Sequence, residues 1–214
     1  IFTCSTGRCG TAYLANLFDA KHEPQPKLMQ EGNVALAAMT RDVAANGNQG
    51  AARDYLSTVK LPHIERTCDR RVYFETAHTF SKGFLLPLID VLGTRLKIIR
   101  LRRRSTDVVN SLMRLGTIPP GNAWYLRGTD AICGDRMSGE AGAGLSDREK
   151  CFWYVEEIER QWSRLIKPRL SEGQWFEVNL EDMLVESHVL RELEAFVGLP
   201  LVRERIGRRL NARR

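Results

Sequence analysis

Two short stretches of the chain carry the residues best suited to bind an anion. The first is S-T-G-R-C-G at residues 5–10, where two glycines bracket an arginine, and the second is R-L-R-R-R at residues 100–104. Glycine lets the backbone approach an anion closely, and the guanidinium group of arginine binds phosphate or sulfate oxygens through forked hydrogen bonds. Both stretches therefore predict contacts with a phosphate or sulfate group.

The sequence around the first stretch predicts the elements that would position it. Apolar residues over 1–4 predict a buried strand, and the apolar residues over 11–20 repeat with helical spacing. A helix that begins at Thr11 directs its unpaired N–H groups and the positive end of its dipole toward the turn. The turn is thus expected to form a phosphate cradle. It is not the magnesium-nucleotide loop G-x-x-x-x-G-K-[ST], because Gly10 is followed by Thr11 and Ala12 and not by a lysine and then a hydroxyl residue.

This first stretch resembles the 5′-phosphosulfate loop of sulfotransferases that use 3′-phosphoadenosine 5′-phosphosulfate (PAPS), with Cys9 at a position where the family usually has serine. Residues 96–112 resemble the 3′-phosphate-binding segment of the same family. Arg103 and Ser111 match its phosphate-binding arginine and serine, although the usual R-D-P-R-D reads R-R-S-T-D here. Residues 175–200 resemble a late scaffold segment of the family, in which a strand and an acidic turn lead into a helix.

The resemblance implies that PAPS is the sulfuryl donor, that 3′-phosphoadenosine 5′-phosphate (PAP) is released, and that no metal is required. It assigns donor binding to a set of residues from both stretches: Ser5, Thr6, Gly7, Arg8, Cys9, Gly10, Thr11, Arg103 and Ser111.

Sulfuryl transfer also needs positive charge on the leaving phosphate and a base for the attacking hydroxyl or amine. Arg8 would supply the charge. Glu23 matches the catalytic glutamate that several bacterial-type and tyrosylprotein-type sulfotransferases place after the first helix, and we expect it to be the base. His78 is the alternative base or a contact to the leaving group, and an imidazole suits either task at neutral pH. Lys82 could add charge, but its spacing supports no specific role.

A stretch over 117–147 is too long for an ordinary connection, and loops of this length in compact domains are often binding loops. We expect it to bind the acceptor. The acceptor-binding residues predicted here and near the first helix are His22, Trp124, Tyr125 and Arg127. The alternative is a surface loop with one packed aromatic pair.

Strands and helices alternate along the chain, which predicts a parallel sheet. The expected strands are 1–4, 72–75, 96–101 and 175–179, and the expected helices are 11–20, 82–92, 106–115, 148–166 and 187–197, with a partly helical region over 27–59. The fold class is therefore α/β, with helices on both faces of a parallel β-sheet, and the resemblance implies a P-loop-like nucleotide-binding fold. A chain of 214 residues can form one core, so we expect a single domain over 1–214.

Composition agrees with an anionic ligand, because the net charge is +6 and 25 of the 32 basic residues are arginine. No nucleic-acid-binding signature is evident. No apolar span is long enough for a membrane segment, and we expect a cytoplasmic protein. The five cysteines lack the spacing of a zinc site, and their odd number leaves at least one unpaired.

The sequence thus predicts a sulfotransferase that moves a sulfuryl group from PAPS to a small-molecule, carbohydrate or peptide acceptor. Two alternatives stay open. An atypical P-loop kinase would require ATP and magnesium, and a non-catalytic binder of anionic polymers would use the arginine-rich surface alone.

Overall fold

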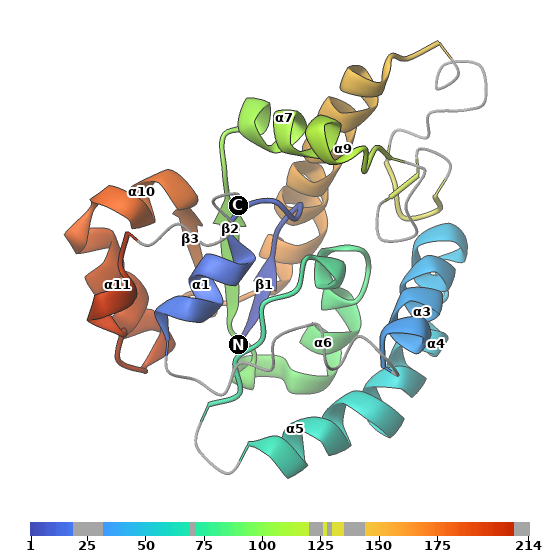
Figure 1. Ribbon diagram of the computed structural model, residues 1–214. Helices are drawn as coiled ribbons and strands as arrows, with labels where there is room; N and C mark the ends of the chain where they lie inside the picture. Colours follow the sequence, from blue (N-terminus) through green and yellow to red (C-terminus); the bar gives the residue numbers. More distant parts are fainter. Residues whose placement is uncertain (19–31, 69–71, 120–125, 128–129, 135–143, 208–214) are drawn as a thin grey trace.

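The computed structural model describes residues 1–18, 32–68, 72–119, 126–127, 130–134 and 144–207. Helices surround a small central sheet (Figure 1). The α-helices are α1 (Thr11–Leu17), α3 (Gly32–Asn46), α4 (Gln49–Tyr55), α5 (Leu61–Thr67), α6 (Leu85–Leu92), α7 (Ser105–Leu115), α9 (Asp147–Gln161), α10 (Leu180–Val185) and α11 (Ser187–Val197). Shorter 3₁₀ turns lie at His78–Ser81, Gly93–Arg95, Lys167–Arg169 and Arg203–Arg205, and π-helical turns at Leu56–Lys60 and Trp162–Ile166.

The sheet has three strands, β1 (Phe2–Cys4), β2 (Ile98–Arg102) and β3 (Trp175–Asn179), in the order β1-β2-β3. Both pairs of neighbouring strands are parallel. The carboxyl ends of β1 and β2 therefore lie at the same edge, and the two arginine-containing stretches both begin there. In open parallel sheets this edge is where ligands bind.

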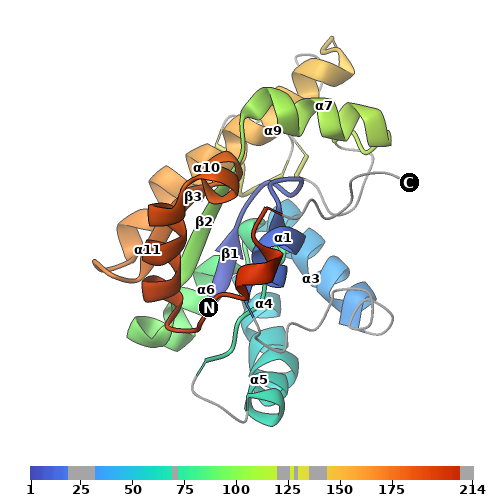
Figure 2. The same ribbon diagram turned by 60° about the vertical axis from the view of Figure 1, so that its left-hand side comes forward.

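Helices cover both faces of the sheet, as the sequence predicts (Figures 1 and 2). Ile99 and Leu101 of β2 point into a core shared with α1, α7 and α11. Ile98, their neighbour in the strand, points into a second core shared with α4, α6 and the π-helical turn after α9. Because side chains alternate along a strand, a sheet covered on both faces needs apolar residues at successive positions.

The strand predicted over 72–75 is wrong, since this segment makes one parallel bridge, between Glu75 and Phe2. The next possible ladder bond is replaced, because the N–H of Ala77 donates to Oγ1 of Thr3 at 3.1 Å rather than to a backbone carbonyl. The chain then leaves the sheet and enters the 3₁₀ turn that carries His78.

Several helix boundaries also differ from the prediction. The first helix ends at Leu17 rather than at residue 20, because Phe18 is already extended. The acidic turn predicted after β3 forms the short helix α10. The helix stop predicted at Gly198 is confirmed, with a left-handed φ of 73° and an N–H that donates to Glu194 O at 2.8 Å.

Residues 201–207 pack against α1. The N–H of Val202 donates to Leu17 O at 2.7 Å, and the N–H of Gly207 donates to the hydroxyl of Tyr13 at 3.0 Å. Arg205 donates to Asn16 O at 3.1 Å. The first helix is therefore held from outside by the last described segment.

Candidate functional site

The turn at residues 5–10 has a left-handed backbone at three positions. The φ angles are 81° at Gly7, 60° at Arg8 and 88° at Gly10, which is the N-cap residue of α1. A bulky residue such as arginine rarely adopts a positive φ, and such strain is found most often at functional sites. Turns of this kind can form a concave nest of backbone N–H groups that binds anions.

Both bracketing glycines are closely packed. A Cβ atom at Gly7 would lie 3.1 Å from Cγ of His78, which is tighter than an ordinary contact, and one at Gly10 would lie 2.6 Å from Cδ1 of Leu180, whose side chain would have to move. The glycines therefore serve the close packing of the turn as well as its positive φ angles.

Side chains from other elements hold the turn by its backbone carbonyls. Ser81 Oγ donates to Ser5 O at 2.7 Å, Tyr154 Oη donates to Thr6 O at 2.5 Å, and Arg103 Nη1 donates to Arg8 O at 3.1 Å. These donors come from the 3₁₀ turn after residue 77, from α9 and from the loop before α7. The conformation of the turn thus depends on three separate parts of the fold.

The hydroxyl and thiol side chains of the turn bond within it. Ser5 Oγ accepts the N–H of Gly7 at 3.3 Å, and Thr6 Oγ1 donates to the carbonyl of Gly7 at 2.7 Å. Thr6 Oγ1 also lies 2.9 Å from Sγ of Cys9. Cys9 is buried, and this burial raises the pKa of its thiol. These side chains shape the turn, which leaves its backbone and Arg8 as the groups that can bind an anion.

The predicted 5′-phosphate and 3′-phosphate stretches meet in space. Nε of Arg8 donates to Oγ of Ser111 at 3.1 Å, although the two residues are 103 positions apart in sequence. Ser111 lies on the inner side of α7 and is 4% exposed, whereas Arg8 is exposed. Arg103 lies beside them through its bond to Arg8. One ligand could therefore contact all three side chains.

Glu181 of α10 braces the turn before α7. Its Oε1 accepts the backbone N–H of Arg104 at 3.4 Å and lies 4.0 Å from Nε of Arg103. This acidic segment was expected to be scaffold, and Glu181 lies against Arg103, the predicted phosphate-binding arginine, so it is a scaffold residue whose negative charge acts on the candidate site.

Beneath the turn lies a pair of basic residues, His78 and Lys82. Nζ of Lys82 lies 2.8 Å from Nδ1 of His78 and donates to the carbonyl of His78 at 2.6 Å. Lys82 is buried, and burial lowers its pKa to about 7. Burial also lowers the pKa of His78 well below its ordinary value, and the positive charges of Lys82 and Arg8 add to this effect.

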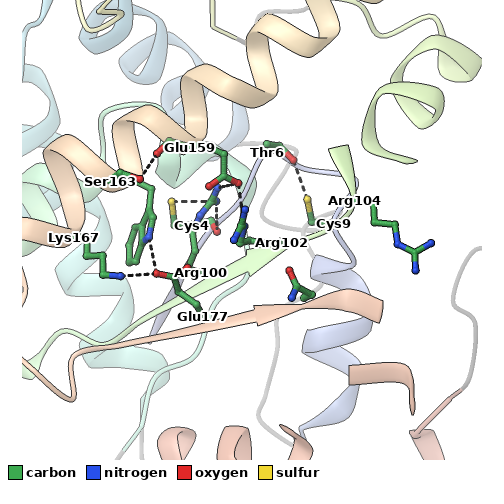
Figure 3. Close-up of polar contacts among 12 residues, drawn as sticks. Cys4, Thr6, Cys9, Arg100, Arg102, Arg104, Glu159, Ser163, Lys167 and Glu177 are labelled. Atoms are coloured by element: carbon green, nitrogen blue, oxygen red, sulfur yellow. Dashed lines mark hydrogen bonds and ion pairs between the residues drawn. The ribbon is translucent and has the colours of Figure 1, made fainter. Parts of the chain in front are cut away.

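A buried arginine, Arg100 of β2, holds the carboxyl end of β1. Figure 3 shows Arg100 and Arg102 of β2 reaching toward Glu159 of α9, with Arg104 pointing away from them. Arg100 donates to Cys4 O at 3.0 Å and forms an ion pair with Glu159 at 2.6 Å. Because this carbonyl ends the strand that leads into the turn, the pair fixes where the turn begins.

Four of the predicted site residues lie outside the described residues: His22, Glu23, Trp124 and Tyr125. Arg127 is described and exposed, and its N–H donates to Oδ2 of Asp130 at 2.7 Å. Asp130 is buried in a forked ion pair with Arg41 of α3, at 2.9 and 2.6 Å. This pair joins the middle of the 117–147 stretch to α3.

Cysteine and acidic residues suggest no further site in the described part of the chain. No disulfide joins the five cysteines, all of which are described, so the prediction of an unpaired cysteine is confirmed. The described residues include no His, Cys, Asp and Glu cluster suited to a metal ion. No described helix has the length and apolar character needed to span a membrane.

The parallel sheet, the helices on both faces and the glycine-containing turn after the first strand define a P-loop-like α/β fold. No family model matches the sequence, and no curated protein matches it. Among solved structures, the chain is similar to the sulfotransferase domain of the olefin synthase of Synechococcus PCC 7002, with a TM-score of 0.52 and 15% sequence identity. The similarity covers 93% of this chain and 72% of that one. The two proteins share a fold.

Three further residues shape the site. Lys82 contacts His78, a predicted catalytic residue, Tyr154 contacts the turn, and Glu181 lies beside Arg103. Lys82 and Glu181 had local signals, in F-S-K-G-F and in the acidic turn after the last strand, and Tyr154 had none. Tyr154 and Glu181 reach the site through tertiary contacts that no local pattern encodes.

Proposed function

We propose that this protein is a sulfotransferase that transfers the sulfuryl group of PAPS to an acceptor hydroxyl or, less favourably, an amine. The observation that carries the proposal is the meeting of Arg8 with Ser111 and of Arg103 with the Arg8 carbonyl. PAPS has anionic groups at its 5′ and 3′ ends. The two candidate anion-binding stretches at one edge of the sheet could each bind one of these groups. The fold shared with a sulfotransferase domain supports the same proposal.

The geometry of the turn fits an anion. Gly7, Arg8 and Gly10 have positive φ angles, so the turn can direct successive backbone N–H groups toward the 5′-phosphosulfate. Arg103 and Ser111 would bind the 3′-phosphate. Arg8, which is exposed and bonded to Ser111, lies between the two regions and would neutralise the charge that develops on the leaving phosphate.

In the proposed reaction, the acceptor oxygen attacks sulfur in line with the bond from sulfur to the 5′-phosphate oxygen. The new O–S bond forms, the old bond breaks, and PAP leaves with the bonding electron pair. The acceptor proton passes to a base, for which we propose Glu23 on the family resemblance, with His78 as the alternative. As in phosphoryl transfer, most of the rate would come from positioning and charge stabilisation.

The acceptor is proposed to be a small molecule, a carbohydrate or a peptide, and residues 117–147 are proposed to contact it. Arg127 is exposed, and the Arg41–Asp130 ion pair fixes the backbone beside it. An acceptor with an acidic group would suit this arginine.

Calorimetric titration with PAP tests the donor site, with ATP plus magnesium as the comparison. The proposal requires tight binding of PAP in the presence of EDTA and a large loss of affinity in Arg103→Ala. Preference for ATP with magnesium would instead indicate the kinase alternative. Binding of heparin-like polymers without PAP binding would indicate the anionic-polymer alternative.

The base is tested by turnover once an acceptor has been found by screening with PAPS. Glu23→Ala should reduce kcat by about 100- to 10,000-fold while PAP affinity stays within a few-fold of the wild type. Retained turnover in Glu23→Ala together with a large loss in His78→Gln would move the base to His78.

A further inference from the structure

Lys82 is placed to control the protonation of His78. Its Nζ atom lies 2.8 Å from Nδ1 of His78, and it also donates to the carbonyl of the same residue at 2.6 Å. The side chain of Lys82 is 1% exposed, so bulk water does not compete for these contacts. The His78 ring lies directly against Gly7 in the turn. A change at Lys82 can thus reach the proposed 5′-phosphate site through one side chain.

Several elements surround this pair. The thiols of Cys4 in β1 and Cys9 in the turn lie near Lys82 and would favour its charged form only if they were ionised, and the guanidinium of Arg8 acts on His78. The ring of Tyr154 from α9 has its centroid 5.7 Å from Nζ of Lys82. Both thiols are buried, which raises their pKa values and keeps them neutral near pH 7.

The chemistry of the contact leaves two arrangements for the protons. An ammonium group can only donate, so charged Lys82 requires Nδ1 of His78 to accept, and a neutral imidazole then carries its proton on Nε2. A neutral amine can accept, and the imidazole then carries its proton on Nδ1. Because burial lowers the pKa of Lys82 to about 7, both arrangements are accessible near neutral pH.

We propose that Lys82 is a positioning residue of this site, and that its charge state selects which ring nitrogen of His78 carries the proton. The consequence for catalysis rests on the proposed sulfotransferase function. With Lys82 charged, Nε2 of His78 carries a proton and serves as a hydrogen-bond donor, not as a base. When the pair loses one proton, the ammonium passes a proton to Nδ1, the proton on Nε2 goes to solvent, and Nε2 gains a lone pair that can accept a proton.

Donor binding biases this choice. An anion on the turn favours the ammonium form of Lys82, because an opposite charge nearby stabilises the charged state. The donor-bound site therefore holds His78 as a hydrogen-bond donor to the transferred or leaving group. The task of base then falls to another residue, for which Glu23 is the proposed candidate.

Nitrogen-15 NMR of the histidine side chains of the full chain tests the proposal directly, with the His78 signals assigned by their loss in His78→Gln. In the wild type we expect the proton on Nε2 at pH 6 and on Nδ1 at pH 9, with the change centred near pH 7. Lys82→Met should abolish this change between pH 7 and 9. Lys82→Arg, which keeps its charge, should hold the proton on Nε2 at pH 9.

Lys97→Met provides the matched control, because Lys97 lies at the opposite edge of the sheet and donates to Phe196 O. In this variant, the tautomer of His78 should change with pH as it does in the wild type. A wild-type tautomer that is constant from pH 6 to 9, or a change in Lys82→Met equal to that of the wild type, would overturn the proposal; the wild-type titration decides even where a variant does not fold.

Adding PAP to the same samples separates the two proposals. If saturating PAP raises the pH midpoint of the His78 tautomer change in the wild type, both the donor site and the role of Lys82 are supported. A tautomer change in the free protein without any PAP binding supports the role of Lys82 and refutes the donor assignment. PAP binding with a constant tautomer refutes the role of Lys82 alone.

Discussion

The turn at residues 5–10 and the start of α7 are proposed to bind the two anionic ends of one nucleotide, yet they are built differently. The turn would bind through its backbone, which Ser81, Tyr154 and Arg103 hold by three carbonyls. The region at α7 would bind through side chains, of which Arg103 is only half-buried and lies 4.0 Å from Glu181.

This difference separates two kinds of recognition. A backbone surface held from several sides cannot adapt, so a change in it alters the stability of the fold and binding together. The side chains of the second region can be replaced one at a time. Arg103 belongs to both regions, because it also donates to Arg8 O, whereas Ser111 has no bond to the turn backbone among the bonds described above. Ser111 is therefore expected to report on selectivity for the 3′-phosphate more directly than Arg103.

The largest effect is expected from Gly10→Ala. The new methyl group would lie 2.6 Å from Cδ1 of Leu180, and the alanine would have to adopt a strained φ of 88°. We expect a loss of about 1–3 kcal/mol in the free energy of unfolding, from urea denaturation, and no measurable PAP binding by calorimetry. Gly116→Ala is the control, because its φ of 63° imposes similar backbone strain with no atom within 4 Å of the new Cβ. Equal PAP affinity in the two variants would contradict the rigid-turn account.

Lys82→Met tests the support beneath the turn through the pH dependence of stability. The folded-state pKa of Lys82, about 7, is below the ordinary lysine value of 10.5, so the unfolded state binds more protons between these values. The cost of burying the charge is fully present below pH 7 and diminishes as pH rises toward 10.5. The wild-type free energy of unfolding should therefore rise relative to that of Lys82→Met by up to about 1.4 kcal/mol per pH unit above pH 7. Urea denaturation of both proteins at pH 7.5 and 9 measures this difference. An equal difference in the free energy of unfolding at the two pH values would refute the lowered pKa of Lys82.

Arg103→Ala should weaken PAP binding by about 10- to 100-fold, the usual cost of losing a charge-assisted hydrogen bond. The melting temperature should change little, since Arg103 is partly exposed. Its neighbour Arg104, whose side chain is exposed, is the control, and Arg104→Ala should change PAP affinity by less than about 3-fold. Calorimetry at two salt concentrations distinguishes the two, and an equal loss in both variants would indicate a general basic patch.

The smallest effect is expected from Ser111→Ala. The proposed bond from an uncharged hydroxyl to the 3′-phosphate is lost, so PAP affinity should fall by about 2- to 10-fold while affinity for 5′-AMP, which lacks the 3′-phosphate, stays constant. The ratio of the two dissociation constants measures 3′-phosphate selectivity. A parallel fall in AMP affinity would show that the Arg8–Ser111 bond serves the turn instead of the 3′-phosphate region.

Much of the fold could be predicted from sequence because apolar spacing encodes it locally. The positions of β1, β2, β3 and α11 follow from short apolar runs and from the stop at Gly198. The buried Arg100 could not be predicted, because R-L-R-R-R has the composition of a solvated basic turn. Only the ion pair with Glu159, which lies 59 residues later, makes burial of this guanidinium tolerable.

The candidate site was predictable where the backbone signal is local. The glycines and Arg8 could be identified from their spacing, and Arg103 and Ser111 from the family resemblance; the structure places both of these near Arg8. The side chains that hold the turn were not predictable, because Tyr154 and Ser81 reach it from 148 and 76 residues away along the chain. A sequence pattern can indicate a binding turn without indicating what keeps it rigid.

The packing of residues 201–207 on α1 has a consequence for biosynthesis. The first helix leaves the ribosome long before the segment that donates to Leu17 O and packs against Tyr13. β1 likewise cannot pair in the sheet until its partner β2 has been synthesised. Such distant closures are slow, because the entropy of long loops must be lost before their contacts form. The turn precedes all of these partners along the chain, so it is expected to be one of the later parts of the nascent chain to reach its final conformation, and until then the apolar side of α1 is exposed.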